Sequence, residues 1–549
     1  MKKEKLFKYL SFGLFATITV ILMTATVMEK LYGTRFVLQS IYHADWMIAL
    51  WCTATLSAIV YILQKKLHRK PATLCIHLAF AVILTGAIVT YTTGKQGQLH
   101  LRIGEYSNSY TLHDGTQASL PFGISLHNFK VTYYAGTEVP MDYISSIVIY
   151  DNKRIEGTVS MNNIFKHCRY RFYQSRYNDD MKGTTFAISY DPWGIGITYS
   201  GYIMLLTSML LFFFQPDSRF RTALQQGKRT ALIVLLLFAA TTSSAKEMGH
   251  IPPQENGIHY QGSATDIHHE ATCDIIAFYN SIANSIPLAI VTLSMGIILF
   301  FIFCINNKGG RLHRTAESAL KAVSITILAY ITLLIALHWY ISGHIPLSNG
   351  RETMIFMAWC SMLSTSLASS KQWSLTPFGY IVCGLTLLVA SMGNTDPHIA
   401  PLAPVLRSPL LSIHVVIIMI SYTLFAFTML NGIAAFIINA TDNNAKSKIA
   451  ELQRKSILML YPAVFLLTAG IFIGATWANI SWGRYWGWDP KEVWALITML
   501  IYSATLHSGS IKAMQRPMFF HAYCIVAFLT VLITYFGVNY LLGGLHSYA

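Results

Sequence analysis

The sequence predicts a mainly α, polytopic membrane helical bundle with one β-rich extracytoplasmic domain. Hydrophobic residues make up 53% of the 549 residues and charged residues 12%, a balance typical of integral membrane proteins. About thirteen apolar runs approach the length of about 20 residues that a spanning helix needs. A single long stretch, residues 94–197, changes to alternating apolar and polar residues. The first two observations predict the bundle, and the third predicts the β-rich domain.

The thirteen apolar runs also predict an orientation. They begin near residues 8, 46, 72, 198, 230, 286, 318, 353, 376, 410, 456, 491 and 518. The run near 230 is short and ends in TTSSAKE, so it fits either a span or an internal signal-like segment. If all thirteen cross and the N-terminus stays inside, every strong basic cluster falls on the inner side, as the positive-inside rule requires. The clusters are Lys65, Lys66, Arg69, Lys70; Arg219, Arg221, Lys228, Arg229; Lys308, Arg311, Arg314; Lys446, Lys448, Arg454, Lys455; and Lys512, Arg516.

This charge pattern predicts a multi-pass membrane protein with the C-terminus outside. The net charge of +15 arises mainly in loops between apolar runs, so it does not indicate binding to nucleic acid. In the predicted outer domain, GISLHNFKVTYYAG, DYISSIVIYDN and TTFAISYDPW alternate in the manner of strands. We expect a β-sandwich-like fold there. A second outer segment, 245–285, is polar and is expected to be a loop or linker.

The usual motifs of soluble enzymes and metal sites are missing from the sequence. The eight cysteines form no CxxC pair, so their spacing indicates neither a zinc site nor a dithiol redox centre. No CxxCH is present either, which excludes a c-type haem bound covalently to this chain. Few acidic residues lie in the apolar runs, which disfavours an ion-driven transporter. Histidine, with 19 copies, is the abundant candidate ligand, because neutral imidazole binds haem iron and other metals.

Residues 477–490, WANISWGRYWGWDP, hold four of the 11 tryptophans and are called here the tryptophan segment. One interpretation is a belt at the membrane interface, and the other is an aromatic shelf for a flat apolar ligand. A belt requires no fixed order of Trp, Gly and Asp, so the order favours the shelf. Asp489 and Pro490 suit the N-cap and first position of a following helix, and Glu492 suits its first turn.

The positions of the histidines alone leave several candidates. His77 and His507 fall toward the cytoplasmic side, whereas His414 and His546 fall at the outer face. Histidines also cap helix ends or bond to carbonyls in membrane proteins without binding a ligand. Further histidines near the outer face are His43, His338, His344 and His398.

Four stretches resemble the CcsA/ResC family of haem-handling proteins in system II cytochrome c biogenesis. WANISWGRYWGWDPKEVWALITMLIYSATLH is similar to the family's WWD signature, WGxxWxWDPKExW. SGHIPLSNGRETMIFMAW, LLSIHVVIIMISYTLFAF and FGVNYLLGGLHSYA resemble three further family segments, with Arg351 where the pattern usually has Tyr. Earlier in the chain, HLAFAVILTGAIVTYTTGKQGQLHLRIGE, LPFGISLHNFKVTYYAGTEVP and YRFYQSRYNDD resemble the partner family CcsB/ResB.

The two resemblances together imply a natural fusion, a CcsBA-type cytochrome c synthase. They divide the chain into a CcsB/ResB-like part (1–215), a linker with a possible extra span (216–285) and a CcsA/ResC-like part (286–549) with the WWD motif at 477–494. Matching by motif assigns His414 and His546 as external ligands of haem iron, and His77 and His507 as transmembrane ligands. The aromatic shelf is Trp477, Trp482, Trp486 and Trp488, and Arg484 is a candidate partner for a haem propionate. No metal other than haem iron is expected.

The resemblance also implies an activity and partners. Haem b would be moved across the membrane and joined by thioether bonds to the CxxCH cysteines of apocytochrome c. Partners would then be haem, apocytochrome c and the thiol-reducing proteins that keep its cysteines reduced. Two alternatives stay open from the sequence: a haem exporter without ligation activity, and a b-type electron-transfer protein. No span carries the two spaced histidines that cytochrome b bundles commonly use to stack two haems.

Overall fold

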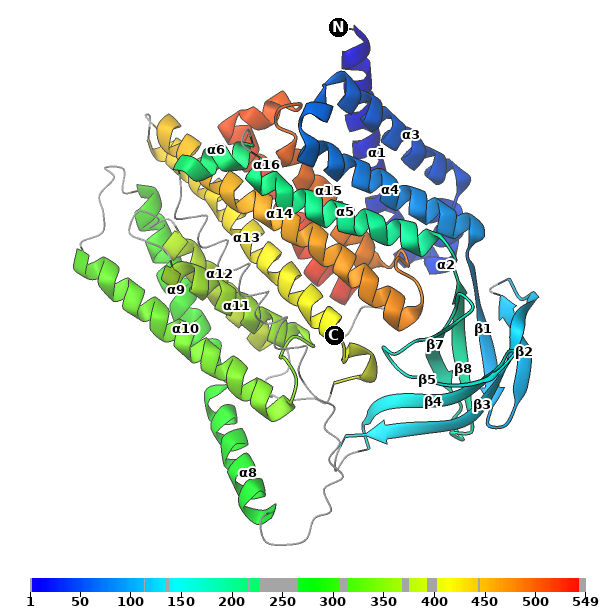
Figure 1. Ribbon diagram of the computed structural model, residues 1–549. Helices are drawn as coiled ribbons and strands as arrows, with labels where there is room; N and C mark the ends of the chain where they lie inside the picture. Colours follow the sequence, from blue (N-terminus) through cyan, green and yellow to red (C-terminus); the bar gives the residue numbers. More distant parts are fainter. Residues whose placement is uncertain are drawn as a thin grey trace. The chain divides into compact units, whose positions relative to one another are not determined.

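The computed structural model describes residues 2–112, 114–134, 138–215, 218–226, 265–305, 314–367, 375–392, 402–442 and 445–542 (Figure 1). The chain forms two compact units. Unit 1 contains Met1–Gln215, Pro401–Leu411 and Phe472–Glu492, and unit 2 contains Pro216–Ala400, Ser412–Ile471 and Val493–Ala549. The tryptophan segment therefore belongs to the same unit as the N-terminal helices and the β-rich domain.

Ten candidate spans, long and apolar enough to cross a membrane, occur in the described residues, which confirms the polytopic membrane fold. Each is built mainly on one α-helix, with η7 (Ile533–Leu542) continuing the last. These helices are α1 (Lys2–Tyr32), α3 (Asp45–Gln64), α4 (Pro71–Thr93), α5 (Gly194–Phe214), α9 (Ile286–Ile305), α10 (Arg314–Ser342), α12 (Leu375–Met392), α13 (Pro409–Thr441), α14 (Lys446–Trp482) and α16 (Pro517–Leu532).

The other three predicted runs have different outcomes. The runs near 353 and 491 form α11 (Gly350–Leu367) and α15 (Pro490–Leu506), which have 18 and 17 residues and are not among the ten. The run near 230 lies outside the described residues. The remaining helices are α2 (Thr34–Val37), η1 (Leu38–Tyr42), η2 (Leu67–Arg69), α6 (Arg219–Gln226), α8 (Thr265–Ile282), η5 (Pro404–Leu406) and η6 (Lys512–Gln515).

The expected β-rich domain is confirmed between α4 and α5. Its eight strands form one antiparallel sheet in the order β5-β4-β3-β2-β1-β8-β7-β6. The strands are β1 (Lys95–Arg102), β2 (Tyr106–Leu112), β3 (Gln117–Tyr133), β4 (Pro140–Tyr150), β5 (Arg154–Val159), β6 (Phe165–His167), β7 (Tyr170–Tyr177) and β8 (Gly183–Tyr190). Because β1 follows α4 and β8 precedes α5 along the chain, the domain is attached to these two helices (Figure 1).

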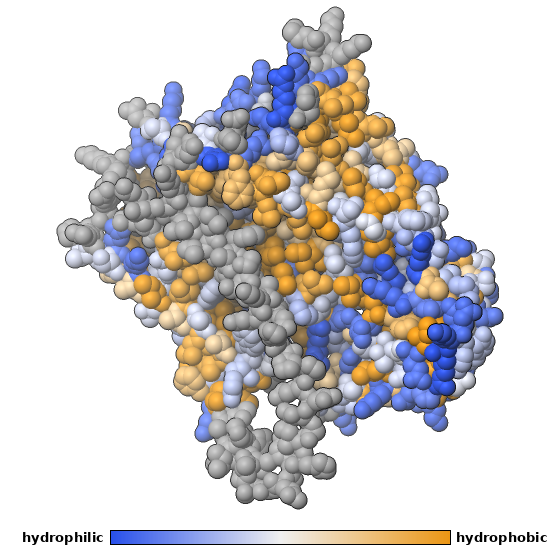
Figure 2. Space-filling view, viewed as in Figure 1, coloured by the Kyte–Doolittle hydropathy of each residue, from blue (hydrophilic) through white to orange (hydrophobic). Residues whose placement is uncertain are grey.

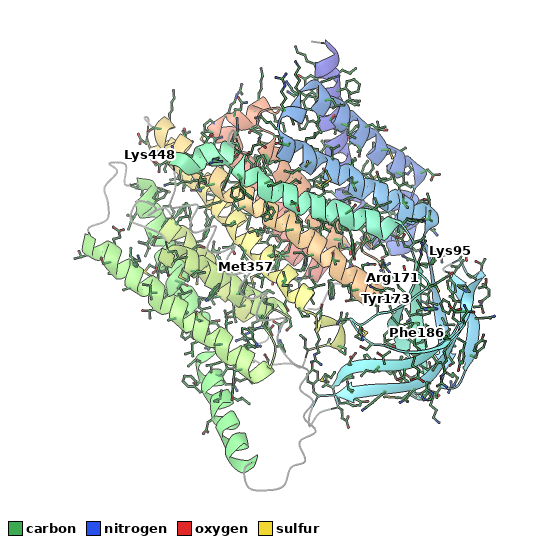
Figure 3. The ribbon with its side chains drawn as sticks, in the orientation of Figure 1. Lys95, Arg171, Tyr173, Phe186, Met357 and Lys448 are labelled. Carbon is green, nitrogen blue, oxygen red and sulfur yellow. The ribbon has the colours of Figure 1, made fainter. Side chains whose placement is uncertain are left out.

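The sheet curls so that its two edge strands approach each other. β5 and β6 are at opposite ends of the strand order, yet only residues 160–164 join them. A Cβ built on Gly157 of β5 would lie 2.2 Å from the Phe165 ring of β6, so the strands are in close contact. We expected a β-sandwich-like fold, and a single curled sheet forms the packing instead of two separate sheets. It encloses a core of Leu101, Ile124, Leu126, Ile149, Val159, Phe172 and Phe186. Figure 3 marks Phe186 within this domain.

The surface of unit 1 separates into an apolar and a polar region. Figure 2 shows apolar residues over its helices and mainly hydrophilic residues over the β-rich domain. Val20, Leu56, Ile203 and Phe214, all on the long helices, are more than half exposed. Side chains of this kind are stable there only against lipid or another apolar surface. This distribution agrees with helices in a bilayer and a β-rich domain in water.

Close packing of α4 against α5 depends on glycine. A Cβ on Gly86 of α4 would lie 2.3 Å from Oγ1 and 2.6 Å from the backbone nitrogen of Thr198 on α5. A Cβ on Gly194 of α5 would lie 2.0 Å from Oγ1 of Thr90 on α4. Small residues at such positions allow helix backbones to pack closely where lipid supplies no hydrophobic drive for association.

We expect Gly86→Leu to destabilise unit 1 by about 1–3 kcal/mol through overpacking against α5. Gly196→Leu is the matched control, because a Cβ at Gly196 of α5 would meet nothing within 4 Å. Thermal unfolding of the detergent-solubilised protein should show a lower transition temperature for the first variant only. Equal transitions for both variants would contradict the assigned α4–α5 contact.

Candidate functional site

Hydrogen bonds around the start of α15 fix the end of the tryptophan segment. The Lys491 backbone N–H donates to Asp489 Oδ1 over 2.9 Å, which confirms Asp489 as the N-cap ahead of Pro490. Glu492 Oε2 accepts from the backbone N–H groups of Gly487 (2.8 Å) and Asp489 (3.3 Å). Asp489 and Glu492 therefore form a capping box, so these two residue types have a structural role in this turn.

Two residues with positive φ set the path of the backbone before this cap. Gly483 has φ +79°, and a Cβ there would lie 2.8 Å from the ring of Tyr173 on β7; Figure 3 labels Tyr173. Trp488 has φ +56°, a conformation that costs a residue with a side chain about 1 kcal/mol or more. Its indole stacks on the Tyr42 ring at 4.6 Å with an interplanar angle of 8°. This stacking offsets part of the backbone cost.

The four tryptophans of the segment differ in exposure. Trp477 is only 1% exposed and packs edge to face on Trp482, with ring centroids 4.8 Å apart. Trp486 and Trp488 are also perpendicular, at 5.9 Å and 88°. Trp482, Trp486 and Trp488 are half-buried. Trp477 therefore supports the segment from within, while the other three keep apolar ring surface accessible.

A chain of hydrogen bonds joins the segment to the helices that flank the β-rich domain. The Tyr485 hydroxyl donates to Thr90 Oγ1 over 3.0 Å, and Thr90 donates to Asp191 Oδ2 over 2.6 Å. Asp191 Oδ1 in turn accepts the backbone N–H of Gly194 at the start of α5, at 2.7 Å. Burial raises the pKa of Tyr485, so its phenol stays protonated and remains a donor.

Residues 401–411 are also joined by hydrogen bonds to the β-rich domain. Ser481 donates to Asn162 Oδ1 over 2.5 Å. The Asn162 amide lies 3.2–3.3 Å from the carbonyl oxygens of Pro404, Val405 and Arg407. A single asparagine in the connection between β5 and β6 therefore links the β-rich domain, residues 401–411 and the tryptophan segment. Arg484, the expected propionate partner, is half-buried and makes no ion pair with a described residue.

Three of the four expected histidine ligands share one tautomer. His77 Nδ1 lies 2.7 Å from the Thr73 carbonyl oxygen, and His507 Nδ1 lies 2.8 Å from that of Ser503. His414 Nδ1 lies 2.6 Å from the carbonyl oxygen of Gly470 on α14. Because a carbonyl oxygen only accepts, each Nδ1 must carry a proton, and in the neutral ring the lone pair through which imidazole can bind a metal is on Nε2. The fourth histidine, His546, lies outside the described residues.

Other histidines show that this pattern is not general. His521 is fully buried and has Nε2, not Nδ1, 3.3 Å from a carbonyl oxygen, that of Ile449. His338 uses both ring nitrogens, as described below. His344 does share the pattern, with Nδ1 3.1 Å from the Ile345 carbonyl oxygen and a buried Nε2 that has no hydrogen-bond partner among the described residues. The tautomer is therefore a requirement for ligation but does not by itself identify a ligand.

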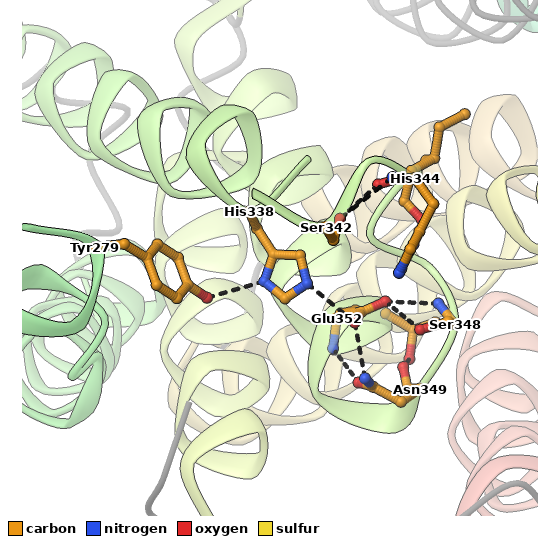
Figure 4. Close-up of polar contacts among 9 residues, drawn as sticks. Tyr279, His338, Ser342, His344, Ser348, Asn349 and Glu352 are labelled. Carbon is orange, nitrogen blue, oxygen red and sulfur yellow. Dashed lines mark hydrogen bonds and ion pairs between the residues drawn. The ribbon is translucent and has the colours of Figure 1, made fainter. Parts of the chain in front are cut away.

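A polar network that the sequence analysis did not predict lies in unit 2 (Figure 4). The Tyr279 hydroxyl is 2.9 Å from His338 Nδ1, and His338 Nε2 is 3.2 Å from Glu352 Oε1. Glu352 also accepts hydrogen bonds from the backbone and hydroxyl of Ser348 and from the Asn349 amide. Asn349 Oδ1 accepts the Glu352 N–H at 3.0 Å, so Asn349 caps the start of α11.

The sequence did contain a signal for part of this network and none for the rest. Asn349 and Glu352 have the N-x-x-E spacing of a capping box. Tyr279 and His338 are more than 50 residues apart in sequence, and nothing in the local pattern pairs them. The same is true of Tyr42 and Asn162, which contact the tryptophan segment through tertiary packing alone.

Ten apolar helices among the described residues, a β-rich domain and a segment of half-buried tryptophans define the class: a multi-pass membrane protein with a partly exposed aromatic surface. Comparison with known proteins identifies the family. The family model described as cytochrome C assembly protein matches residues 347–546, and the ResB-like family model matches residues 62–190.

Individual relatives agree with both matches. Protein NrfI of Wolinella succinogenes is 22% identical over 99% of this chain and 96% of its own length. The cytochrome c biogenesis protein CcsA of Guillardia theta is 36% identical over 41% of this chain and 83% of its own length. CcsA of Porphyra purpurea is 34% identical, over 41% and 86% respectively. The chain belongs to the CcsA family of cytochrome c biogenesis proteins and carries a ResB-like segment in the same polypeptide.

We expect Glu492→Ala to loosen the tryptophan segment, because it removes the acceptor for two backbone N–H groups. Each lost bond costs about 0.5–1.5 kcal/mol, which corresponds to about 2- to 13-fold faster amide exchange where opening is local. Hydrogen exchange of a peptide covering residues 483–489 would measure this change. Glu492→Gln keeps an acceptor oxygen and should retain most of the protection. Identical exchange in the Ala variant and the unaltered protein would show that the capping box does not hold the segment.

Proposed function

We propose that this protein is a cytochrome c synthase, which moves haem b across the bacterial cytoplasmic membrane and attaches it to apocytochrome c. In this proposal His77 and His507 accept haem from the cytoplasmic side. His414 and His546 hold it at the extracytoplasmic face for attachment. Membership of the CcsA family supports the general role in cytochrome c biogenesis, and the ResB-like segment supports a fused synthase.

The shared tautomer of three histidines is the observation that most supports the ligand assignment. Metal-binding histidines usually donate the other ring N–H to a carbonyl or carboxylate, which orients the ring and raises the basicity of the coordinating nitrogen. His77, His414 and His507 each make such a bond to a carbonyl, at 2.6–2.8 Å. Haem iron takes one axial ligand from each side of the macrocycle, so two pairs of imidazoles can serve two haem positions.

The tryptophan segment supports the assignment through surface chemistry. The half-buried indoles of Trp482, Trp486 and Trp488 offer the apolar surface that a flat macrocycle requires. Trp477 is proposed to act with them by supporting Trp482. Arg484 is half-buried and has a guanidinium suited to a haem propionate. A shelf held by a capping box and by the Trp488–Tyr42 stack needs little rearrangement to bind a rigid ligand.

In the proposed reaction, each cysteine thiol of a CxxCH peptide adds across one vinyl group of haem. The sulfur forms a C–S bond and the proton goes to the other vinyl carbon, so the addition needs no oxidant. The peptide's cysteines supply the nucleophiles, and the protein's own contribution is to hold haem and peptide together. Thiol-reducing proteins are expected partners, because a disulfide in the peptide would block both additions.

A haem exporter without ligation activity is the alternative that shares most of these features. Coexpression with a secreted CxxCH apocytochrome distinguishes the two. A synthase yields cytochrome whose haem stays with the polypeptide after denaturation and gives the pyridine haemochrome of a c-type product. If haem reaches the outside but every cytochrome molecule loses it on denaturation, the protein exports haem without ligating it.

Alanine variants of the two histidine pairs are expected to have different defects. His77→Ala and His507→Ala should lower copurified haem by about 10-fold or more, because ligand loss weakens binding at least as much as loss of an outer-shell partner. His414→Ala and His546→Ala should change the axial spectrum of the iron and abolish covalent attachment. His127→Ala, at an exposed position of β3, is the control and should change neither. Normal haem content and normal maturation in the His77 and His507 variants would show that the inner pair is not needed for haem transfer.

A further inference from the structure

Two hairpin turns of the β-rich domain bring three different metal-binding side chains together. Asp151 follows β4 in the turn to β5, and His167 and Cys168 lie at the turn from β6 to β7. The ligand atoms of the three residues all lie within 4.8 Å of one another. The curl of the sheet produces this approach, because it places the edge strand β5 beside the edge strand β6.

The three side chains are held by the surrounding backbone and packing. The β6–β7 turn has Cys168 at φ +48° and Arg169 at φ +67°, the left-handed pair typical of a tight two-residue hairpin loop. His167 pairs with Tyr170 across the hairpin and packs edge to face on Phe122 at 4.8 Å. The Asn152 N–H donates to Asp151 Oδ1 over 2.8 Å. A ligand would therefore meet donors that are already positioned.

The distances converge on one carboxylate oxygen. Asp151 Oδ2 lies 3.1 Å from His167 Nε2 and 3.9 Å from Cys168 Sγ. Around a tetrahedral Zn²⁺ with bond lengths of about 2.0–2.3 Å, donor atoms are about 3.3–3.8 Å apart. The observed separations lie on either side of this range, so small side-chain rotations would bring the donors to it.

One donor of the site carries a negative charge. Hydrogen bonds from the Asn152 amide and the His167 ring lower the pKa of Asp151, so its carboxylate is charged at neutral pH. The nearest arginines in sequence have other partners: Arg169 stacks over the Trp193 ring at 5.0 Å, and Arg154 pairs with Glu156 at 3.0 Å. Cys168 is exposed, and the side chains of His167 and Asp151 are 16% and 34% exposed. An ion can therefore reach the donors from solvent.

We propose that Asp151, His167 and Cys168 form a binding site for a borderline-soft divalent cation, Zn²⁺, in the β-rich domain. One carboxylate, one imidazole and one thiolate fill three positions, which leaves the fourth for water or an incoming ligand. In the structure His167 Nε2 donates to the Asp151 carboxylate, so binding needs the other tautomer, with the ring proton on Nδ1. Binding also converts the Cys168 thiol to the thiolate and releases the thiol proton to solvent. The site contains one cysteine, and its carboxylate comes from a different turn, so no CxxC motif marks it. It does not depend on the proposed haem chemistry.

Co²⁺ added to the purified full-length protein tests the site directly. The expected result is a thiolate-to-cobalt charge-transfer band that saturates at one equivalent and is displaced by Zn²⁺. Cys168→Ser should abolish the band, and His167→Gln and Asp151→Asn should weaken Co²⁺ binding by about 10-fold or more. Cys52→Ser, a half-buried cysteine of α3, is the matched control and should leave the band unchanged.

A second measurement needs no variant of the site and so cannot fail through misfolding. Zn²⁺ should slow alkylation of Cys168 in the unaltered protein, followed by mass spectrometry, without slowing alkylation of Cys52. Equal alkylation rates of Cys168 with and without Zn²⁺ would overturn the proposal. A cobalt band that persists in Cys168→Ser would overturn it as well. Either result would leave the Asp151–His167 contact as a hydrogen bond between two turns and nothing more.

Discussion

A backbone carbonyl that accepts the Nδ1 proton orients the ring of each described candidate haem ligand. For His77 and His507 the acceptor is four residues earlier in the chain, so the helix itself supplies it. For His414 the acceptor is Gly470 on another helix, and this bond depends on close packing. A Cβ on Gly470 would lie 2.5 Å from Ile418 Cδ1, so glycine allows α13 and α14 to approach. An imidazole in a membrane helix is costly unless it is satisfied, and the bond satisfies one nitrogen while orienting the other.

The proposed haem shelf also requires a rigid tryptophan segment, because three of its large apolar rings are only half-buried. Exposed tryptophans in a mobile loop would collapse onto the nearest apolar surface. Here Glu492 closes a capping box, Trp488 stacks on Tyr42, and Tyr485 joins the chain of hydrogen bonds to Asp191. Tyr42 and Asp191 belong to the N-terminal part of unit 1, Met1–Gln215. A natural fusion therefore has a structural rationale, since the N-terminal part of the chain helps to shape a segment that lies near the C-terminal end.

The sequence predicted those features that depend on local pattern. Apolar run length predicted the spanning helices, period-two alternation predicted the β-rich domain, and Asp489, Pro490 and Glu492 predicted the start of α15. It could not predict partners set by tertiary packing: Tyr42 beneath Trp488, or Asn162 beside residues 404–407. It also could not distinguish Trp477, which is 1% exposed, from the tryptophans that keep exposed surface. The positions of the histidines along the predicted spans reduced the number of candidate haem ligands. The tautomer that distinguishes His414 from His521 could be seen only in the structure.

In the proposed function, histidine Nε2 atoms, oriented by carbonyl-bound Nδ1 atoms, hold haem b without a covalent bond. Electron paramagnetic resonance of the oxidised protein, purified with its copurifying haem, tests this claim most directly. Ligation by two imidazoles predicts a low-spin iron signal, and the absence of a covalent bond predicts haem that acidified solvent extracts completely. A protein purified from haem-replete cells without haem, or with only high-spin iron that lacks a second imidazole, would contradict it.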